Sequence, residues 1–402
     1  MDKMKKISLI ILTIGFIFSS CKNGNMEFPD YDYSAVYFAY QTPVRTIELG
    51  TDYVIDNTLD NEHKCQIMAT VGGLREVKQD IEIDFNVDNS LCNGLENVEA
   101  MPSNYYTLSD NKIIIKKDSK MLGGVVVQLT DAFFADPLSL TTNYVIPLVM
   151  TNVKNADKIL TGTPLVDNAN RLKPEDWDVA PKDYILYAIK YLNPYDVIYL
   201  RRGTDNITID GATTTETRKG PYSTPEGDEV IRLNSISMNA LEFPVTNQKV
   251  NNVNLNMTFR LNFDPATQKC TFANGTWKDN QLVNEYTFLY AEDVDDKAKT
   301  HTQKSFRVFD IAVSGSGEYV KDGEKNSWGN KDRDALYLTY NDDYKVDDMV
   351  RVGIEDKNNP NVITWEEWVV NKTYSISYAT EDVLVFRDRG ISLETFDPVL
   401  IP

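Results

Sequence analysis

Histidine and cysteine are both scarce in this chain of 402 residues, which has two histidines and four cysteines. Neither His63 nor His301 stands in a nucleophile motif, an H-E-x-x-H motif or any other metal motif, so the sequence argues against a hydrolase triad and against a zinc site. No cysteine pair has the spacing of a zinc ribbon. We therefore expect both histidines to be surface or turn residues, and we expect no cofactor and no bound metal.

Basic residues are also in deficit, because 41 lysines and arginines stand against 60 acidic residues, giving a formal net charge of −19. A surface of that sign repels nucleic acid and anionic lipid headgroups. We therefore exclude nucleic acid as a partner. Any contact with a membrane should come through attached acyl chains rather than through a basic patch.

Long hydrophobic runs are missing except at the start, where an apolar run extends from Ile7 to Phe18. At about a dozen residues it is shorter than the roughly 20 that a membrane-spanning helix needs. Lysines precede the run, and Ser19, Ser20 and Cys21 follow it. This order is typical of a bacterial lipoprotein signal peptide, residues 1–20, with Cys21 as the lipidated residue. We expect palmitate on Cys21 and an outer-membrane, lipid-anchored protein. Display on the cell surface is the leading expectation, and attachment at the periplasmic face is the alternative.

Three cysteines remain once Cys21 is lipidated, namely Cys65, Cys92 and Cys270. An odd number cannot all pair. Cys65 and Cys92 lie on or near neighbouring expected strands, so one disulfide between them and a set of buried free thiols are both open at this point.

Short alternations of apolar and polar residues dominate residues 35–155, as in 81–87 and 125–129. Period two indicates strands with one buried face. We expect an N-terminal immunoglobulin-like, antiparallel β-sandwich at 35–155, preceded by a polar tether at 21–34. Pro147 suggests that the strand at 144–150 is an edge strand. Periodicity fades over 156–182, which we interpret as a linker.

The remaining residues, 183–402, again read as strands, most clearly at 253–263, where every second residue is apolar. About ten strands in roughly 220 residues favour a closed antiparallel barrel or a large sandwich, since closure removes exposed edges. The predicted class is therefore all-β, with a sandwich followed by a larger C-terminal β-barrel domain.

Several stretches resemble a known family. Residues 33–38, 80–88, 105–108 and 144–148 resemble the N-terminal domain of unknown function in Bacteroides-type surface lipoproteins of polysaccharide-utilisation loci. Residues 177–184 and Tyr199-Leu200-Arg201-Arg202-Gly203 are similar to a companion C-terminal domain, which the resemblance implies is lipocalin-like. The resemblance implies a role in glycan capture, but it names no functional residues.

Sugar binding requires flat aromatic faces beside polar groups that pair with hydroxyls. Trp328 is the best candidate, because the loop at 322–332 is polar and contains glycine, with no apolar partner in register. Its neighbours Asn326 and Asn330 would supply amides, and Trp277 is a weaker second aromatic candidate. The alternative is that the Trp328 indole folds back as a plug.

Acidic residues offer no specific site. Two groups of aspartates lack the spacing of a calcium loop, so we interpret them as solvated loops; they are Asp293, Asp295 and Asp296, and Asp342, Asp343, Asp347 and Asp348. Glu366 and Glu367 are adjacent, so in a strand they would face opposite ways and could not act on one glycosidic bond.

The sequence thus favours a non-enzymatic glycan-binding lipoprotein that captures a poly- or oligosaccharide, with an outer-membrane importer complex as a candidate partner. Two alternatives remain. One is an envelope glycosidase or esterase whose site is dispersed over several strands. The other is a structural or assembly lipoprotein that binds another outer-membrane protein through an exposed strand edge.

Overall fold

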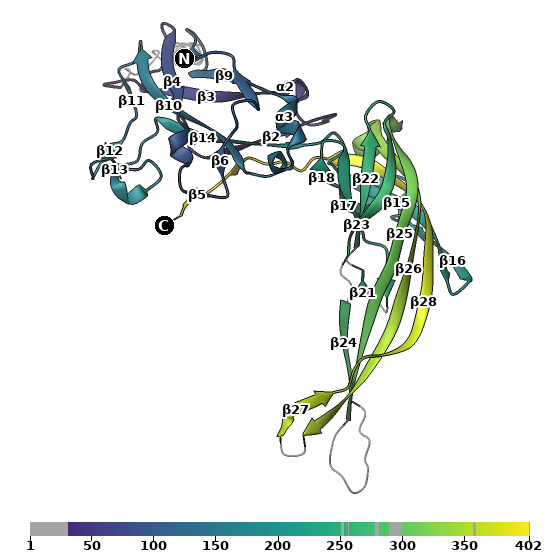
Figure 1. Ribbon diagram of the computed structural model, residues 1–402. Helices are drawn as coiled ribbons and strands as arrows, with labels where there is room; N and C mark the ends of the chain where they lie inside the picture. The colour runs from purple at the N-terminus through teal and green to yellow at the C-terminus, as the bar shows by residue number, and fades with distance from the viewer. Residues whose placement is uncertain are drawn as a thin grey trace, which may run out of the picture.

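The computed structural model describes residues 31–250, 253–255, 257–277, 281–288, 300–356 and 359–401, and two β-rich lobes make up the molecule (Figure 1). The predicted all-β class is confirmed. The only helices in the described part are short: α2 (Thr58–Asn61), α3 (Asp131–Ala135) and the 3₁₀ turns η1 (Asn89–Cys92), η2 (Pro137–Leu140), η3 (Pro174–Asp176), η4 (Pro225–Gly227) and η5 (Trp328–Asn330). None of the described helices has the length and apolarity that a membrane span requires.

Two facing sheets form the first lobe. One contains, in spatial order, β11 (Lys158–Ile159), β1 (Ala35–Tyr37), β3 (Lys64–Gly72), β9 (Leu122–Leu129) and β7 (Tyr106–Leu108). The other contains β29 (Glu394–Thr395), β2 (Pro43–Glu48), β14 (Tyr184–Leu192), β10 (Tyr144–Lys154), β4 (Ile81–Val87) and β8 (Lys112–Ile115), with β6 (Glu99–Ala100) beside β10. Two small pairs complete the lobe: β5 (Leu95–Glu96) with β30 (Val399–Leu400), and β12 (Thr163–Pro164) with β13 (Trp177–Val179).

The alternation read from the sequence explains how these sheets pack. In β4, Ile81, Ile83 and Phe85 are buried, whereas the residues between them are partly exposed. The buried side chains of both sheets join in one hydrophobic core. A β-sandwich is therefore what the period-two pattern produces.

Strand β14 does not open the second domain, as the sequence analysis expected. It lies inside the first lobe, antiparallel to β10 and parallel to β2, with Ala188 opposite both Val145 and Val44. Its apolar run is nearly continuous because both of its faces are buried. The sheet is therefore mixed rather than antiparallel, and the first domain extends to Leu192.

The segment 156–182 is likewise part of the first lobe and not a linker. Strand β11 within it pairs with β1, and Asp157 accepts hydrogen bonds from the backbone N–H and the hydroxyl of Ser34, at 2.6 and 2.7 Å. Ser34 is thereby held in the lobe rather than in a tether, and Tyr31 already donates to the carbonyl of Gly73. Residues 1–30, including the predicted lipid site Cys21, lie outside the described residues.

The chain also returns to the first lobe after the second. Strand β29 pairs with the free edge of β2, and β30 pairs with β5. The predicted domain 183–402 is therefore corrected at both ends, because its first strand and its last residues belong to the sandwich.

Strand β10 is central and not an edge strand, although it contains Pro147. Pro147 stands opposite Leu186 on one side. On its other side, pairing with β6 ends at Val145 and pairing with β4 begins at Leu148. Pro147, which has no backbone N–H, therefore lies between the two paired segments on that side. No strand-to-strand hydrogen bond is lost there.

One curled sheet forms most of the second lobe. Its main strands run in the order β16 (Ala212–Arg218), β15 (Ile198–Ile209), β28 (Val369–Asp388), β26 (Arg333–Asp356), β25 (Thr300–Glu324), β23 (Lys269–Trp277), β22 (Met257–Asp264), β19 (Ala240–Val245) and β18 (Asn234–Ser237). Three shorter strands pair with it: β17 (Glu229–Arg232), β24 (Gln281–Phe288) and β27 (Asn359–Trp365). A separate pair is formed by β20 (Lys249–Val250) and β21 (Val253–Asn254).

This sheet is curled around its own core but, over the described residues, its end strands β16 and β18 do not pair with each other. It differs in this respect from the closed barrel that the sequence suggested. Strands β25, β26 and β28 are unusually long and extend well beyond the first lobe (Figure 1). Side chains on the concave face of the sheet form a second hydrophobic core. Beyond the edge of that core, the same face carries polar residues.

Candidate functional site

The polar part of the concave face contains a cavity of about 620 Å³. Strands β15, β16 and β28 supply its floor, and the segments around η4 and after β19 supply its walls. Register places the floor residues on one face, because Ile207 stands opposite both Thr214 and Tyr378. The cavity is lined by Arg201, Ile207, Ile209, Thr214, Glu216, Arg218, Lys219, Gly220, Gly227, Glu229, Thr246, Asn247 and Tyr378.

A buried network of alternating charges forms the floor. Arg201 is fully buried, and its Nε and Nη2 atoms lie 2.9 and 2.8 Å from Oδ2 of Asp382. Arg218 bridges two carboxylates, donating from Nη2 to Asp382 and from Nε to Asp205, each at 2.6 Å. Tyr340 accepts from Arg201 at 3.1 Å. Each buried charge thus has an opposite partner, which is the condition for keeping it in a low-dielectric site.

Gly203 makes this network possible. It lies on β15 directly between Arg218 on β16 and Asp382 on β28. A Cβ atom at this position would stand 2.0 Å from Oδ1 of Asp382 and 2.9 Å from Arg218. The two side chains therefore meet over the one residue of the intervening strand that has no side chain.

The carboxylates of the site differ in protonation. Burial alone would raise the pKa of Asp205, but hydrogen bonding and the charge of Arg218 hold that pKa below its usual value. Asp342, deeper on the same face, has a pKa raised to about 7, mainly by burial and then by nearby Asp343 and Asp205. Its Oδ2 accepts from the Gln248 amide at 2.7 Å. One carboxylate near the cavity is therefore held ionised, and another is poised to titrate near neutral pH.

Several polar atoms around this cavity are buried without a hydrogen-bond partner. They include both amide atoms of Asn247 and the Nη1 atom of Arg218, with Oε1 of Gln248 and Oδ1 of Asp342 behind them. The Asn247 side chain lies close to Asp205 and helps to lower the pKa of that carboxyl, but neither of its amide atoms makes a hydrogen bond of normal geometry. Buried polar groups of this kind are normally paired, so they are available to water or to a polar ligand.

The sequence-predicted site lies elsewhere. Asn326, Trp328 and Asn330 share the turn between β25 and β26, and both asparagines are exposed. The Trp328 indole is half-buried, with the Arg387 guanidinium 5.8 Å from its ring centroid. Arg387 is next to Phe386, whose side chain is in the concave core. Because neighbouring strand residues face opposite sides, the Trp328 turn packs on the convex side of β28. Gly329 of this turn helps to lower the pKa of Glu226, which is next to the cavity residue Gly227.

Trp277 is not brought to the Trp328 turn. Register places Lys269 of β23 opposite Glu318 of β25, near that turn, and Trp277 is eight residues further along the strand. That separation is roughly 26 Å at about 3.3 Å per residue. The role of the four predicted residues in glycan binding stays a prediction.

The charged floor was not predicted, although part of its signal is visible in the sequence. Arg201 and Gly203 belong to the stretch 199–203 that carried the family resemblance, without any role assigned to them. Asp342 was interpreted as part of a solvated acidic loop, whereas it is a buried residue of β26. Nothing in the local sequence pointed to Asp382 or Arg218.

The cysteines and one histidine take positions that the sequence did not settle. Cys65, Cys92 and Cys270 are free thiols, so Cys65 and Cys92 form no disulfide. No group of three or more potential metal ligands occurs among the described residues, and Asp293, Asp295 and Asp296 lie outside them. His301 is buried rather than on the surface, with Nε2 2.7 Å from Oε1 of Glu355.

Comparisons with known proteins agree with the domain division seen in the structure. A family model described as a domain of unknown function, DUF5627, matches residues 194–390, and a model of an N-terminal domain matches residues 31–157. The first match begins just after β14, where the curled sheet begins. The comparison with curated proteins gave no match.

Among solved structures, a protein of unknown function from Bacteroides ovatus is 35% identical to this chain, with a TM-score of 0.70. The match covers 92% of this chain and 100% of that protein. A multidomain protein including DUF1735 from Bacteroides ovatus is 10% identical, with coverages of 89% and 97% and a TM-score of 0.32. A third, from Bacteroides ovatus ATCC 8483, is provisionally described as a carbohydrate-binding protein; it is 13% identical, with coverages of 92% and 100% and a TM-score of 0.23. The chain belongs to the same Bacteroides-type family of unknown function as the first of these proteins, and its second domain matches DUF5627.

Proposed function

We propose that this protein binds a glycan in the cavity on the concave face of its second lobe. The observation that supports the proposal is a set of buried polar atoms around the cavity that have no hydrogen-bond partner. The main ones are the amide atoms of Asn247 and Nη1 of Arg218, which has only a 4.0 Å ion-pair contact with Glu229. An amide and a guanidinium offer both donors and acceptors, and a sugar hydroxyl pairs with either kind. Tyr378 and Ile209 line the same cavity. Tyr378 is only 5% exposed, so Ile209, which is 43% exposed, offers most of the apolar surface for the C–H groups of a pyranose.

The charges of the floor favour an uncharged, hydroxyl-rich ligand. Arg201 and Arg218 are already neutralised by Asp205 and Asp382. A strongly anionic or cationic ligand would have to break these pairs, whereas a neutral glycan can hydrogen-bond to them without breaking them. The cavity is also large enough, at about 620 Å³, for a short oligosaccharide segment.

The test is isothermal titration of the purified protein with xylan, glucomannan, xyloglucan, pectic galactan, laminarin and dextran. Asn247→Ala should weaken binding of the captured polysaccharide about tenfold, the effect of losing one or two hydrogen bonds. Trp328→Ala is the matched comparison and should leave the affinity unchanged. Loss of binding in Trp328→Ala with normal binding in Asn247→Ala would move the site to the convex turn, and failure of the wild type to bind any of these polysaccharides contradicts the proposal.

We further propose binding without catalysis. A glycosidase needs one carboxyl group held protonated as an acid and a second group acting as nucleophile or base across the bond. The carboxyl groups that line this cavity are Glu216 and Glu229. Glu229 already lies within ion-pair distance of two guanidinium groups, those of Arg201 and Arg218, at 3.6 and 4.0 Å. The same titrations also address the enzymatic alternative, because release of reducing ends from a bound polysaccharide would identify a glycosidase.

The anchor is a separate part of the proposal and rests on the sequence before the first lobe. Cys21 should carry the lipid that holds the protein at the outer membrane, where an importer complex is the candidate partner. Cys21→Ala should take up no radiolabelled palmitate, since the acceptor thiol is gone. Cys65→Ala, which removes a buried thiol, should label as the wild type does. Equal labelling of Cys21→Ala and wild type would contradict lipidation at Cys21.

A further inference from the structure

A second cavity, of about 410 Å³, lies where the two lobes meet. Strand β2 and the loop 52–55 form one side of it, and the returning segment 388–393 forms the other. It is separate from the concave-face cavity and shares no lining residue with it. We call it the joint cavity.

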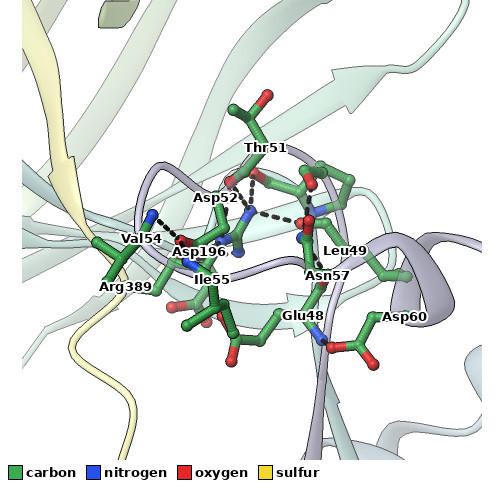
Figure 2. A network of polar contacts seen from close by, with 12 residues as sticks. Glu48, Leu49, Thr51, Asp52, Val54, Ile55, Asn57, Asp60, Asp196 and Arg389 are labelled. Atoms are coloured by element: carbon green, nitrogen blue, oxygen red, sulfur yellow. Dashed lines mark hydrogen bonds and ion pairs between the residues drawn. The ribbon is translucent and has the colours of Figure 1, made fainter. Parts of the chain in front are cut away.

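Nearly all charges around the joint cavity have partners. Arg389 is buried and donates to backbone carbonyls of both lobes, including Leu49 and Pro194 at 2.5 and 3.2 Å (Figure 2). Asp52 accepts from the backbone N–H groups of Val54 and Ile55. The Arg389 guanidinium and the Asp52 carboxylate therefore already have hydrogen-bond partners within the joint between the lobes.

Asp60 and Arg45 satisfy each other in the same way. They form an ion pair, and the second oxygen of Asp60 accepts from the Glu48 backbone N–H at 3.0 Å. Asp388, at the rim, pairs with Arg387 at 3.1 Å. Both carboxylates therefore already have a charged partner, unlike Glu48.

The exception is Glu48. Only 2% of the residue is exposed, and its carboxylate makes no hydrogen bond or ion pair with the described residues, although it lines the joint cavity. Burial raises the pKa of Glu48 to about 7, against the lowering effect of the nearby Arg389 and Arg45 charges. A buried carboxylate without a donor is unfavourable, so this group is open to a cationic or hydrogen-bonding ligand.

The mouth of the joint cavity is apolar and unusually exposed. Leu393 is 98% exposed and Val54 is 79% exposed, and both line the cavity with Ile55. Around the floor, Arg45 and Arg389 stand against Glu48, Asp52 and Asp60, a local net charge of −1. The cavity thus combines one unpaired negative charge at depth with apolar surface at its entrance.

We propose that the joint cavity binds a small organic ammonium ion, whose N–H groups donate to the Glu48 carboxylate while its apolar stem lies against Val54, Ile55 and Leu393. A primary ammonium is a compact cation with three donors, and it would give Glu48 the partner that the fold does not supply. The stem would cover apolar surface that otherwise faces water.

The test uses n-butylammonium and its neutral analogue 1-butanol, titrated by ligand-observed NMR against the full chain at pH 8. The ammonium should bind at least tenfold tighter than the alcohol, because only the ammonium pairs with a charge. Glu48→Gln keeps the shape of the side chain and should weaken ammonium binding about 10- to 100-fold, the range for a charge-assisted hydrogen bond. The control Glu62→Gln removes an exposed carboxylate that pairs with Lys64 and should change nothing.

Two further measurements keep the proposal falsifiable. Leu393→Ser should weaken n-butylammonium binding about three- to tenfold without altering the thermal midpoint, since the residue is exposed. Lowering the pH from 8 to 5.5 should weaken binding to the wild type, because Glu48 takes up a proton, and should not affect Glu48→Gln. Equal affinity of wild type and Glu48→Gln, equal binding of the alcohol, or displacement of the ammonium by equimolar Ca²⁺ would overturn the proposal.

Discussion

Asp382→Ala should lower the free energy of unfolding by about 3 to 5 kcal/mol, the typical effect of removing one partner from a buried ion pair. Asp382 accepts from Arg201 and from Arg218. Without it, the buried guanidinium of Arg201 keeps two hydroxyl partners, and its remaining charged partner is Glu229, 3.6 Å away and partly exposed. Equilibrium unfolding in urea, followed by tryptophan fluorescence, measures the change.

A matched control is Asp310→Ala. Asp310 pairs with Lys345 at 2.8 Å, but both side chains are about half exposed. Its removal should therefore cost between about 0 and 1 kcal/mol. If Asp382→Ala and Asp310→Ala are equally stable, then water or another acceptor satisfies Arg201, and the floor of the concave cavity does not depend on the charge network.

Arg389→Ala should destabilise the joint between the lobes by about 2 to 5 kcal/mol, because several buried carbonyl oxygens lose their donor together. The guanidinium donates to the carbonyl oxygens of Leu49, Thr51, Asn193, Pro194 and Asp196. The connection at 193–196 should also become accessible to protease. Urea unfolding and limited proteolysis, with cut sites mapped by mass spectrometry, test both effects.

Arg387→Ala is the control for this change. Arg387 is two residues away and contributes a partly exposed pair with Asp388 and a contact with Trp328. Its removal should cost less than about 1 kcal/mol and leave the joint resistant to protease. A joint that resists protease in Arg389→Ala as it does in wild type would show that β29 and β30 hold the lobes together without this arginine.

The parts of the fold that local periodicity encodes were predictable from the sequence. The alternation at 81–87 gave β4 with its buried face, and similar patterns gave β8 and β9. Strand β14 was placed in the wrong lobe, because an apolar run shows that a strand is buried on both faces but not which sheet buries it. The return of β29 was also invisible, since a two-residue strand has no period.

The candidate site was much less predictable, for a physical reason. Arg201 and Asp382 are 181 positions apart, and only the pairing of β15 with β28 brings them together. A sequence shows each as one charged residue in a polar alternation. Trp328 was selected as a candidate because its loop is polar. The loop sequence alone does not show that the Trp328 indole packs against Arg387 on the convex face of the sheet.

The return of the chain to the first lobe makes the second domain an insertion within the first. Strands on both sides of the insertion, β14 before it and β29 after it, flank the same strand β2. During synthesis, the sandwich therefore receives its outer strand only after the whole inserted domain has been made, which adds non-local contacts to its folding. A single cut in an exposed loop of the second domain would leave each fragment attached to the sandwich by its own strand, so cleavage of the chain there need not release either piece.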